Sequence, residues 1–165
     1  MTEHSRQALV GAFGATYISL AIADIDELSV SSFALLNTAD FERPMQAVER
    51  YLTSIPRCPN KVSIALAGEV EGDGATFTHR DWTLTRNDVR AATGADHVCL
   101  INDIEATALA LPNLSAYDVQ ELIPGKARPY GNKAVLMAGA AAGIAGLVRV
   151  GDSWMPVAGE GGFMR

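Results

Sequence analysis

Three β-forming segments separated by tight turns open the chain, and this arrangement constrains the fold more than any other feature. Gln7–Phe13 (QALVGAF) and Tyr17–Ala23 (YISLAIA) are apolar runs rich in strand-forming residues, and a short turn beginning at Gly14 separates them. A second turn over Asp24–Glu27 leads into a third run, Ser29–Leu35. Because connections this short join antiparallel neighbours, the sequence predicts an antiparallel meander.

A helix and a buried strand follow the meander. Pro44 suits the first turn of a helix whose apolar residues share one face until Pro56 ends it. Lys61–Ala67 (KVSIALA) has the composition of a buried strand. The glycines that follow predict a turn through Gly68, Gly72 and Gly74.

The next segment repeats the order of helix and strand. Thr85 with Asp88 resembles a capping box for a helix that Gly94 ends, and the strand His97–Ile101 comes next, followed by a helix over Ile104–Leu111. A strand, a helix and another strand in this order imply a parallel crossover. The sequence therefore predicts a mixed sheet flanked by helices, with functional groups at the carboxyl ends of its strands.

A change of composition after Pro112 predicts a second structural unit. The residues directly after Pro112 are rich in proline and glycine, as in a connecting loop. We therefore expect one domain over residues 1–112 and another over 113–165. In the second unit, strands at Ala134–Met137 and Ile144–Val150 flank a loop of small residues, and a last short strand lies near Trp154–Val157.

Composition excludes several classes of function. A length of 165 residues with 48% hydrophobic content is enough for a packed core, and a net charge of -6 offers no basic stripe for nucleic acid. Cys58 and Cys99 stand apart, which indicates neither a zinc site nor a disulfide framework, and we expect no bound metal cluster. No apolar run approaches the length of a membrane span, and the first residues lack the layout of a signal peptide. We expect a cytoplasmic protein with no membrane partner.

Two turns of small residues, far apart in the sequence, are candidates for phosphate binding. Gly14 and Thr16 lie in the first turn, and Gly139 and Gly143 lie in the second. Two such turns can bring backbone amides around a polyphosphate from both sides. Each turn taken alone is more often an ordinary hairpin connection.

Four polar residues are candidates for a sugar site. Asp103 follows a strand and opens a helix, where it can accept the proton of a sugar hydroxyl that attacks a γ-phosphoryl group while Asn102 orients the sugar. An ordinary N-cap explains the same aspartate. Glu160 lies among glycines, where a ligand or only solvent can face it. His79 belongs to a polar run that ends at Trp82; such a histidine usually faces solvent, and such a tryptophan usually anchors a core.

Five segments resemble, in order and spacing, the motifs of bacterial glucokinases, and together they span nearly the whole chain. The first resembles the family's first phosphate motif, usually LVGDVGGTNARLAL, and the others resemble TNHTW, INDF, GAGTGLG and PGEGGH. In this chain they read LVGAFGATYISLAI, THRDW, LINDIEATALA, MAGAAAGIAGLV and VAGEGGF.

The resemblance implies an α/β fold of the actin-like ATPase (ribonuclease H-like) type: residues 1–112 as the small lobe, and 113–165 as the crossover and first strands of a second, incomplete lobe. It implies phosphorylation of glucose, or a similar hexose, by ATP and Mg²⁺ to glucose 6-phosphate. Asp103 is then the catalytic base. The other residues implied in substrate or ATP binding are Asn102, Glu160, His79, Gly14, Thr16, Gly139 and Gly143. Since an incomplete lobe leaves apolar surface and strand edges uncovered, we also expect a homodimer.

The motifs also depart from the family pattern. Ala12 replaces an aspartate that helps organise the metal, Ala15 and Ala141 replace glycines, and Ala140 replaces a phosphate-binding threonine. The methyl groups require a backbone that avoids positive φ. Tyr17, His79 and Phe163 replace Asn, Asn and His.

Each lost polar contact costs on the order of 2 to 4 kcal/mol of transition-state stabilisation, so we expect impaired turnover. The family also continues well beyond the GEGG segment, which leaves two readings, a fragment or a half-kinase. The alternative function is a non-catalytic protein that binds sugar or serves as a regulatory scaffold. The related family of repressors and sugar kinases carries a Cys-rich zinc motif after its second glycine loop, where neither Cys58 nor Cys99 lies.

Overall fold

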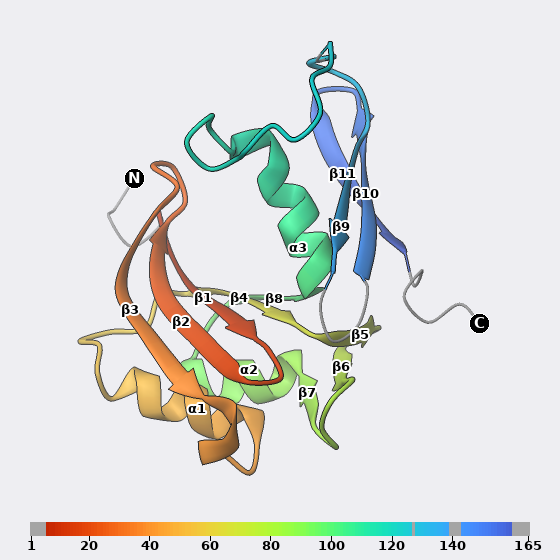
Figure 1. Cartoon of the computed structure of the whole chain (residues 1–165). Helices are drawn as coiled ribbons and strands as arrows, with labels where there is room; N and C mark the ends of the chain where they lie inside the picture. Colours follow the sequence, from red (N-terminus) through yellow and green to blue (C-terminus); the bar gives the residue numbers. More distant parts are fainter. Residues whose placement is uncertain (1–5, 127, 139–142, 160–165) are drawn as a thin grey trace. The chain divides into compact units, whose positions relative to one another are not determined.

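The computed structural model describes residues 6–126, 128–138 and 143–159, and the chain divides into two compact units (Figure 1). The first unit ends at Asp103 and the second begins at Ile104. Each unit has its own cluster of buried apolar residues. The predicted domain boundary at Pro112 stays a prediction.

A five-stranded sheet forms the centre of the first unit, in the order β3-β2-β1-β4-β8. Its strands are β1 (Gln7–Phe13), β2 (Tyr17–Asp24), β3 (Ser29–Asn37), β4 (Lys61–Leu66) and β8 (His97–Asn102). The first three strands pair antiparallel, whereas β4 runs parallel to both β1 and β8. The predicted meander and the predicted mixed sheet are both confirmed.

Two helices, α1 (Pro44–Leu52) and α2 (Arg86–Thr93), cover the same face of this sheet (Figure 1). The predicted capping box starts α2, with reciprocal bonds of 2.9 and 3.1 Å between Thr85 and Asp88, and Gly94 ends it at φ 69°. The prediction that α1 continues to Pro56 was wrong. The helix ends at Leu52, because hydroxyl groups of the next two residues bond to the carbonyls of its last turn.

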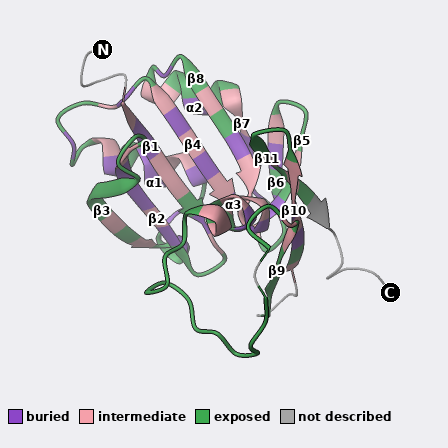
Figure 2. Cartoon of the chain, turned by 90° about the horizontal axis from the view of Figure 1, so that it is seen from above, coloured by how far each residue is buried: buried purple, intermediate pink, exposed green. Residues whose placement is uncertain are grey.

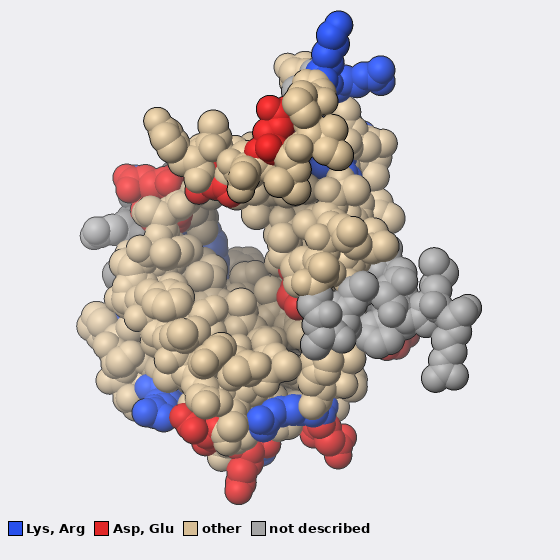
Figure 3. Space-filling view, in the orientation of Figure 1, with Lys and Arg blue, Asp and Glu red and all other residues tan. Residues whose placement is uncertain are grey.

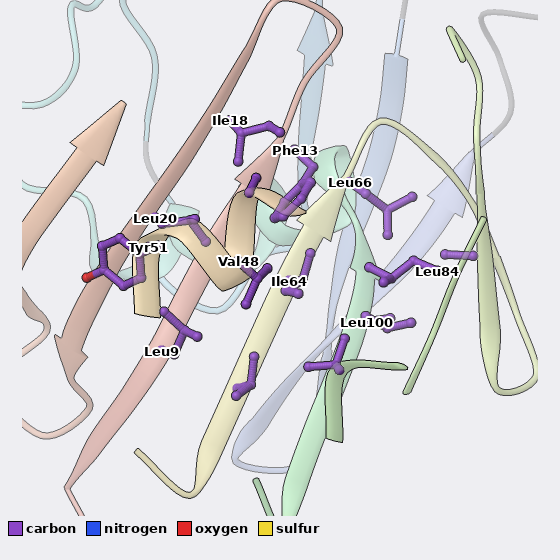
Figure 4. Packing of buried hydrophobic residues seen from close by; sticks show 14 of the residues in the cluster. Leu9, Phe13, Ile18, Leu20, Val48, Tyr51, Ile64, Leu66, Leu84 and Leu100 are labelled. Carbon is purple, nitrogen blue, oxygen red and sulfur yellow. The ribbon is translucent and has the colours of Figure 1, made fainter. Parts of the chain in front are cut away.

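The core lies between the sheet and these helices, because alternate strand residues point toward them. Along β4 the buried residues Val62, Ile64 and Leu66 alternate with half-buried ones (Figure 2). In Figure 4 the side chains of β1, β2 and β4 meet those of α1, with Leu84 and Leu100 beside them. Burial of each large apolar side chain contributes about 1.5–3 kcal/mol, so this layer fixes the sheet.

A small antiparallel sheet lies where the sequence predicted only a glycine-rich turn, and that prediction was incomplete. Its strands are β5 (Gly68–Glu71), β6 (Gly74–Phe77) and β7 (Thr83–Thr85). Gly72, at φ 56°, makes the turn of the first hairpin. Gly68 is required by close approach, because a Cβ there would collide with the carbonyl oxygen of Thr76. Glycine thus marks strand packing here as well as a turn.

The second unit contains the strands β9 (Lys133–Met137), β10 (Gly143–Val150) and β11 (Ser153–Gly159). It also contains the helix α3 (Asp103–Ala110), except for Asp103, which is the last residue of the first unit. The strands pair antiparallel in the order β11-β10-β9, which confirms the predicted hairpin. Residues of α3 and β10 form its small buried cluster: Ile104, Ala108, Ala145 and Leu147. No helix among the described residues is long and apolar enough to cross a membrane.

The acidic segment after β2 is a solvated turn, as the sequence predicted. The Asp24 carboxylate accepts backbone hydrogen bonds of 3.0 Å from Glu27 and Asp26, which hold its pKa below the usual value together with the charge of Arg6. Cys58 and Cys99 are free thiols, and burial raises the pKa of Cys58.

Thr38, the first residue of the short helix η2 (Thr38–Asp40), is a buried polar residue at 1% exposure. Its backbone N–H donates to the carbonyl of Thr16 at 2.9 Å, and its hydroxyl donates to the carbonyl of Gly14 at 3.1 Å. Both bonds hold the turn between β1 and β2 against the segment that follows β3.

Thr38→Val keeps the shape of this side chain but removes its hydroxyl donor. We expect the free energy of unfolding to fall by about 1–3 kcal/mol, because the part-buried Gly14 carbonyl loses a partner. Urea unfolding measures the change. Thr76→Val, at an exposed position of β6, is the matched control and should stay within about 0.5 kcal/mol of the original protein. Equal effects of the two substitutions would contradict a role for the hydroxyl.

Candidate functional site

The carboxyl ends of three neighbouring strands meet at one edge of the five-stranded sheet. In the parallel register, Phe13 of β1 lies opposite Leu66 of β4, and Leu66 lies opposite Asn102 of β8. The backbone N–H of Ala67 continues this alignment with a 3.1 Å bond to the carbonyl of Phe13. The turn after β1 and the residues after β8 therefore emerge at the same edge, where ligands of open parallel sheets bind.

The first of the candidate phosphate loops is a tight turn from Gly14 to Thr16. The N–H of Gly14 donates to the carbonyl of Tyr17 at 2.9 Å, and a Cβ on Gly14 would lie 3.1 Å from that oxygen. This contact explains the glycine. Ala15 has no positive φ, so the backbone accepts its methyl group as the sequence analysis required. Ala12, on β1 just before the turn, is exposed.

His79 lies in the loop between β6 and β7, which the sheet edge holds at both ends. The N–H of Thr78 donates to the carbonyl of Ala67 at 3.0 Å, and the N–H of Phe77 donates to the carbonyl of Trp82 at 3.0 Å. His79 is exposed, and Trp82 is only 7% exposed, which confirms the interpretation of Trp82 as a core anchor. The loop therefore brings His79 beside the Gly14 turn.

A narrow crevice separates the turn from this loop. Its volume is about 10 Å³, which is room for about one water molecule. The residues that line it include Gly14, Ala15, Thr38, Ala67, His79 and Arg80. A ligand larger than water would therefore lie at the mouth of the crevice, against the turn and the histidine loop.

Asn102 and Asp103 stand where β8 passes directly into α3. The Asn102 amide nitrogen donates to the carbonyl of Gly68 at 2.8 Å, which fixes the plane of the amide. Asp103 is half-buried and is the first residue of α3, where the helix dipole favours a carboxylate. An N-cap lies one residue before the first helical residue, and assigned helix ends vary by one or two residues. The position of Asp103 therefore agrees with an N-cap as well as with a catalytic base.

The structure brings part of the predicted site together. Gly14, Thr16, His79 and Asn102 lie at one edge of the first unit, with Asp103 at its end. Gly143 begins β10 in the second unit, where a Cβ would lie 2.6 Å from the end of the Ile104 side chain, so packing also explains that glycine. Two predicted site residues, Gly139 and Glu160, lie outside the described residues, as do Ala140, Ala141 and Phe163.

Three residues that organise this edge were not identified as functional from the sequence. Thr38 holds the turn, Gly68 accepts the bond from Asn102, and Arg80 stacks on Trp82. Gly68 has a weak signal, since it follows a predicted strand directly. Thr38 has none, because its partners depend on how β3 pairs in the sheet.

Comparison with known proteins gives a consistent result. A sequence model of the family described as Glucokinase matches residues 9–165. The glucokinase of Saccharophagus degradans is 34% identical over 137 residues, which cover 82% of this chain and 43% of that protein. The glucokinase of Rhizobium meliloti is 33% identical over 168 residues, covering 99% and 49%. The chain spans about half the length of the curated relatives it matches.

Solved structures agree with the sequence relatives. The glucokinase from an Antarctic psychrotroph superimposes with a TM-score of 0.83 at 26% identity, over 96% of this chain and 51% of that one. A ROK hexokinase from Thermus thermophilus, at 19% identity and a TM-score of 0.65 over 94% of this chain and 50% of that one, shares the fold. The predicted actin-like ATPase fold is thereby confirmed, and the chain belongs to the glucokinase family.

Proposed function

We propose that this chain is a glucokinase-like protein whose reaction is transfer of the γ-phosphoryl group of ATP to the 6-hydroxyl of glucose or a similar hexose, with turnover impaired by its altered phosphate loops. The observation that carries the proposal is the meeting of the Gly14 turn with Asn102 and Asp103 at one edge of the sheet. Membership of the glucokinase family supports the reaction class. A relative of the same fold, the glucokinase of Balamuthia mandrillaris, has been solved with glucose.

In this proposal Asp103 is the base. Its carboxylate accepts the proton of the 6-hydroxyl as the bond from that oxygen to the γ-phosphorus forms and the bond from phosphorus to the β-phosphate oxygen breaks. Asn102 orients the sugar, which suits an amide already held in one plane by the carbonyl of Gly68. By the resemblance to the family, His79 and Glu160 are further sugar-binding residues in this proposal.

By the resemblance to the family, Gly14, Thr16, Gly139 and Gly143 are the phosphate-binding residues in this proposal. When bound, Mg²⁺ would neutralise charge that develops on the phosphates. The described residues include no group of three or more His, Cys, Asp or Glu that could hold a metal ion. Mg²⁺ commonly binds through one or two carboxylates plus substrate phosphates, and Ala12 leaves a methyl group where the family has the carboxylate that helps organise the metal.

Sugar binding without turnover is the second proposal, and Ala12 favours it. A methyl group stands where the family has a carboxylate that organises the metal. Ala12 is exposed, so the substitution removes this metal contact without adding to the buried core. In either case we propose a cytoplasmic protein. The two functions make opposite predictions for ADP release.

Replacement of the base separates these functions. If the chain is a kinase, glucose-dependent ADP release with Mg-ATP should fall about 10³-fold or more in Asp103→Asn, because the proton acceptor is lost while the shape is kept. A coupled assay of ADP measures turnover, and calorimetric titration with glucose measures binding in the same samples. Glucose binding with no ADP release from the original protein would exclude the kinase.

Restoration of the phosphate loops tests where the defect lies. In the triple variant Ala12→Asp, Ala15→Gly, Ala140→Thr, we expect ADP release to rise at least tenfold, because each restored polar group stabilises transferred charge. Ala12→Asp alone should fold normally, since the residue is exposed on its strand. Turnover that stays unchanged in the triple variant would place the defect elsewhere.

We also propose that the chain forms a homodimer through the edge strand β3. The segment Ser29–Asn37 contains no charged residue, and Val30, Phe33 and Leu35 are 63%, 64% and 57% exposed. An apolar hollow of about 250 Å³ lies beside two of them, Val30 and Phe33. Figure 3 shows few charges over this part of the surface. A long uncharged edge strand favours pairing with another chain.

Light scattering at micromolar concentration should therefore report twice the mass of one chain. Phe33→Asp should shift the protein toward the monomer, since it places a charge within the apolar surface of β3. Leu122→Asp is the matched control, at a residue 85% exposed in the loop after η3 (Leu111–Asn113), and should leave the mass unchanged. A monomeric original protein would contradict the proposal.

A further inference from the structure

Arg80 connects two segments that are far apart in the sequence. Its guanidinium carbon lies 4.8 Å from the centre of the Trp82 ring, within its own loop, and its Nη1 donates to the carbonyl of Phe41 at 3.4 Å. Phe41 follows η2 and is 7% exposed. The loop that carries His79 is thus attached to the segment after β3.

That segment is the one that holds the Gly14 turn. The N–H of Phe41 donates to the carbonyl of Thr38 at 3.4 Å, and Thr38 in turn bonds to Thr16 and Gly14. An unbroken series of contacts therefore runs from Arg80 through Phe41 and Thr38 to the turn. All of these residues belong to the first unit.

A second series of contacts closes the loop on its inner side. Phe77 packs edge-to-face between Phe13, at 6.2 Å, and Trp82, at 5.5 Å. Backbone bonds also join Phe13 to Ala67 and Ala67 to Thr78. The crevice between turn and loop is accordingly almost filled, with room for about one water molecule. A large movement of the Gly14 turn relative to the His79 loop would therefore break at least one of these contacts.

We infer that Arg80 is a positioning residue that makes the His79 loop and the Gly14–Thr16 turn move as one body, so that a ligand at one changes the affinity of the other. The ligand part of this inference rests on the proposed function, in which the loop faces sugar and the turn faces phosphate. An arginine suits the role because its planar group stacks on an aromatic ring while its N–H groups donate elsewhere. Coupling between two sites then follows from one shared rigid element.

Hydrogen exchange tests the mechanical part without any ligand. In Arg80→Met, which keeps the aliphatic stem, the amides of Gly14 and Thr38 should exchange about five- to tenfold faster, because one end of the connection is released. Arg50→Met is the matched control: Arg50 lies over the same Phe41 ring, at 5.9 Å, but extends from α1. Unchanged exchange in Arg80→Met, or equal acceleration in Arg50→Met, would overturn the inference.

Calorimetry tests the ligand part. We expect the glucose Kd of the original protein to change at least fivefold when a non-hydrolysable ATP analogue with Mg²⁺ is present. In Arg80→Met this factor should fall at least twofold but not vanish, because the contacts through Phe77 and Ala67 remain. Arg50→Met should retain the factor. An original protein that binds neither ligand contradicts the proposed function, while the exchange result still decides whether Arg80 joins the loops. Coupling that is undiminished in Arg80→Met, or glucose binding without coupling in the original protein, overturns the inference.

Discussion

The parallel alignment of β1, β4 and β8 is the constraint on which the candidate site depends. Apolar packing fixes it, since Phe13, Ile64 and Leu66 are all within 2% of complete burial beneath α1 and α2. Once these strands are in register, the Gly14 turn and Asn102 must emerge at the same edge. The position of the polar groups is therefore a consequence of residues that take no part in chemistry.

The sequence predicts this part of the fold well because the signals are local. The apolar runs of β1 and β4 are flanked by turn residues, and the capping box at Thr85 is complete within four residues. The errors have physical causes as well. The small sheet β5-β6-β7 was missed because its glycines were interpreted as turn residues. Gly68 instead lies in a strand, where a side chain would collide with the backbone of Thr76.

The arrangement of the site is less predictable than its list of residues. Asn102 and Asp103 could be placed from the strand that precedes them. Nothing in the sequence indicates that the side chain of Thr38 will bond to the backbone of Gly14, which lies 24 positions earlier. Arg80 and Phe41 lie 39 positions apart in the sequence and meet only after both segments are folded. Contacts of this kind depend on tertiary packing, which no local pattern encodes.

The separation between the buried layer and the edge of the sheet explains how the chain keeps this architecture although the turn from Gly14 to Thr16 departs from the family pattern. Ala12 is exposed and Ala15 keeps an ordinary backbone conformation, so neither substitution disturbs the buried layer that sets the register. A surface substitution of this sort changes stability by about 0.5 kcal/mol or less, whereas a lost contact to transferring phosphate costs about 2–4 kcal/mol of barrier. The buried layer therefore maintains the fold, which persists when groups at the edge of the sheet are exchanged.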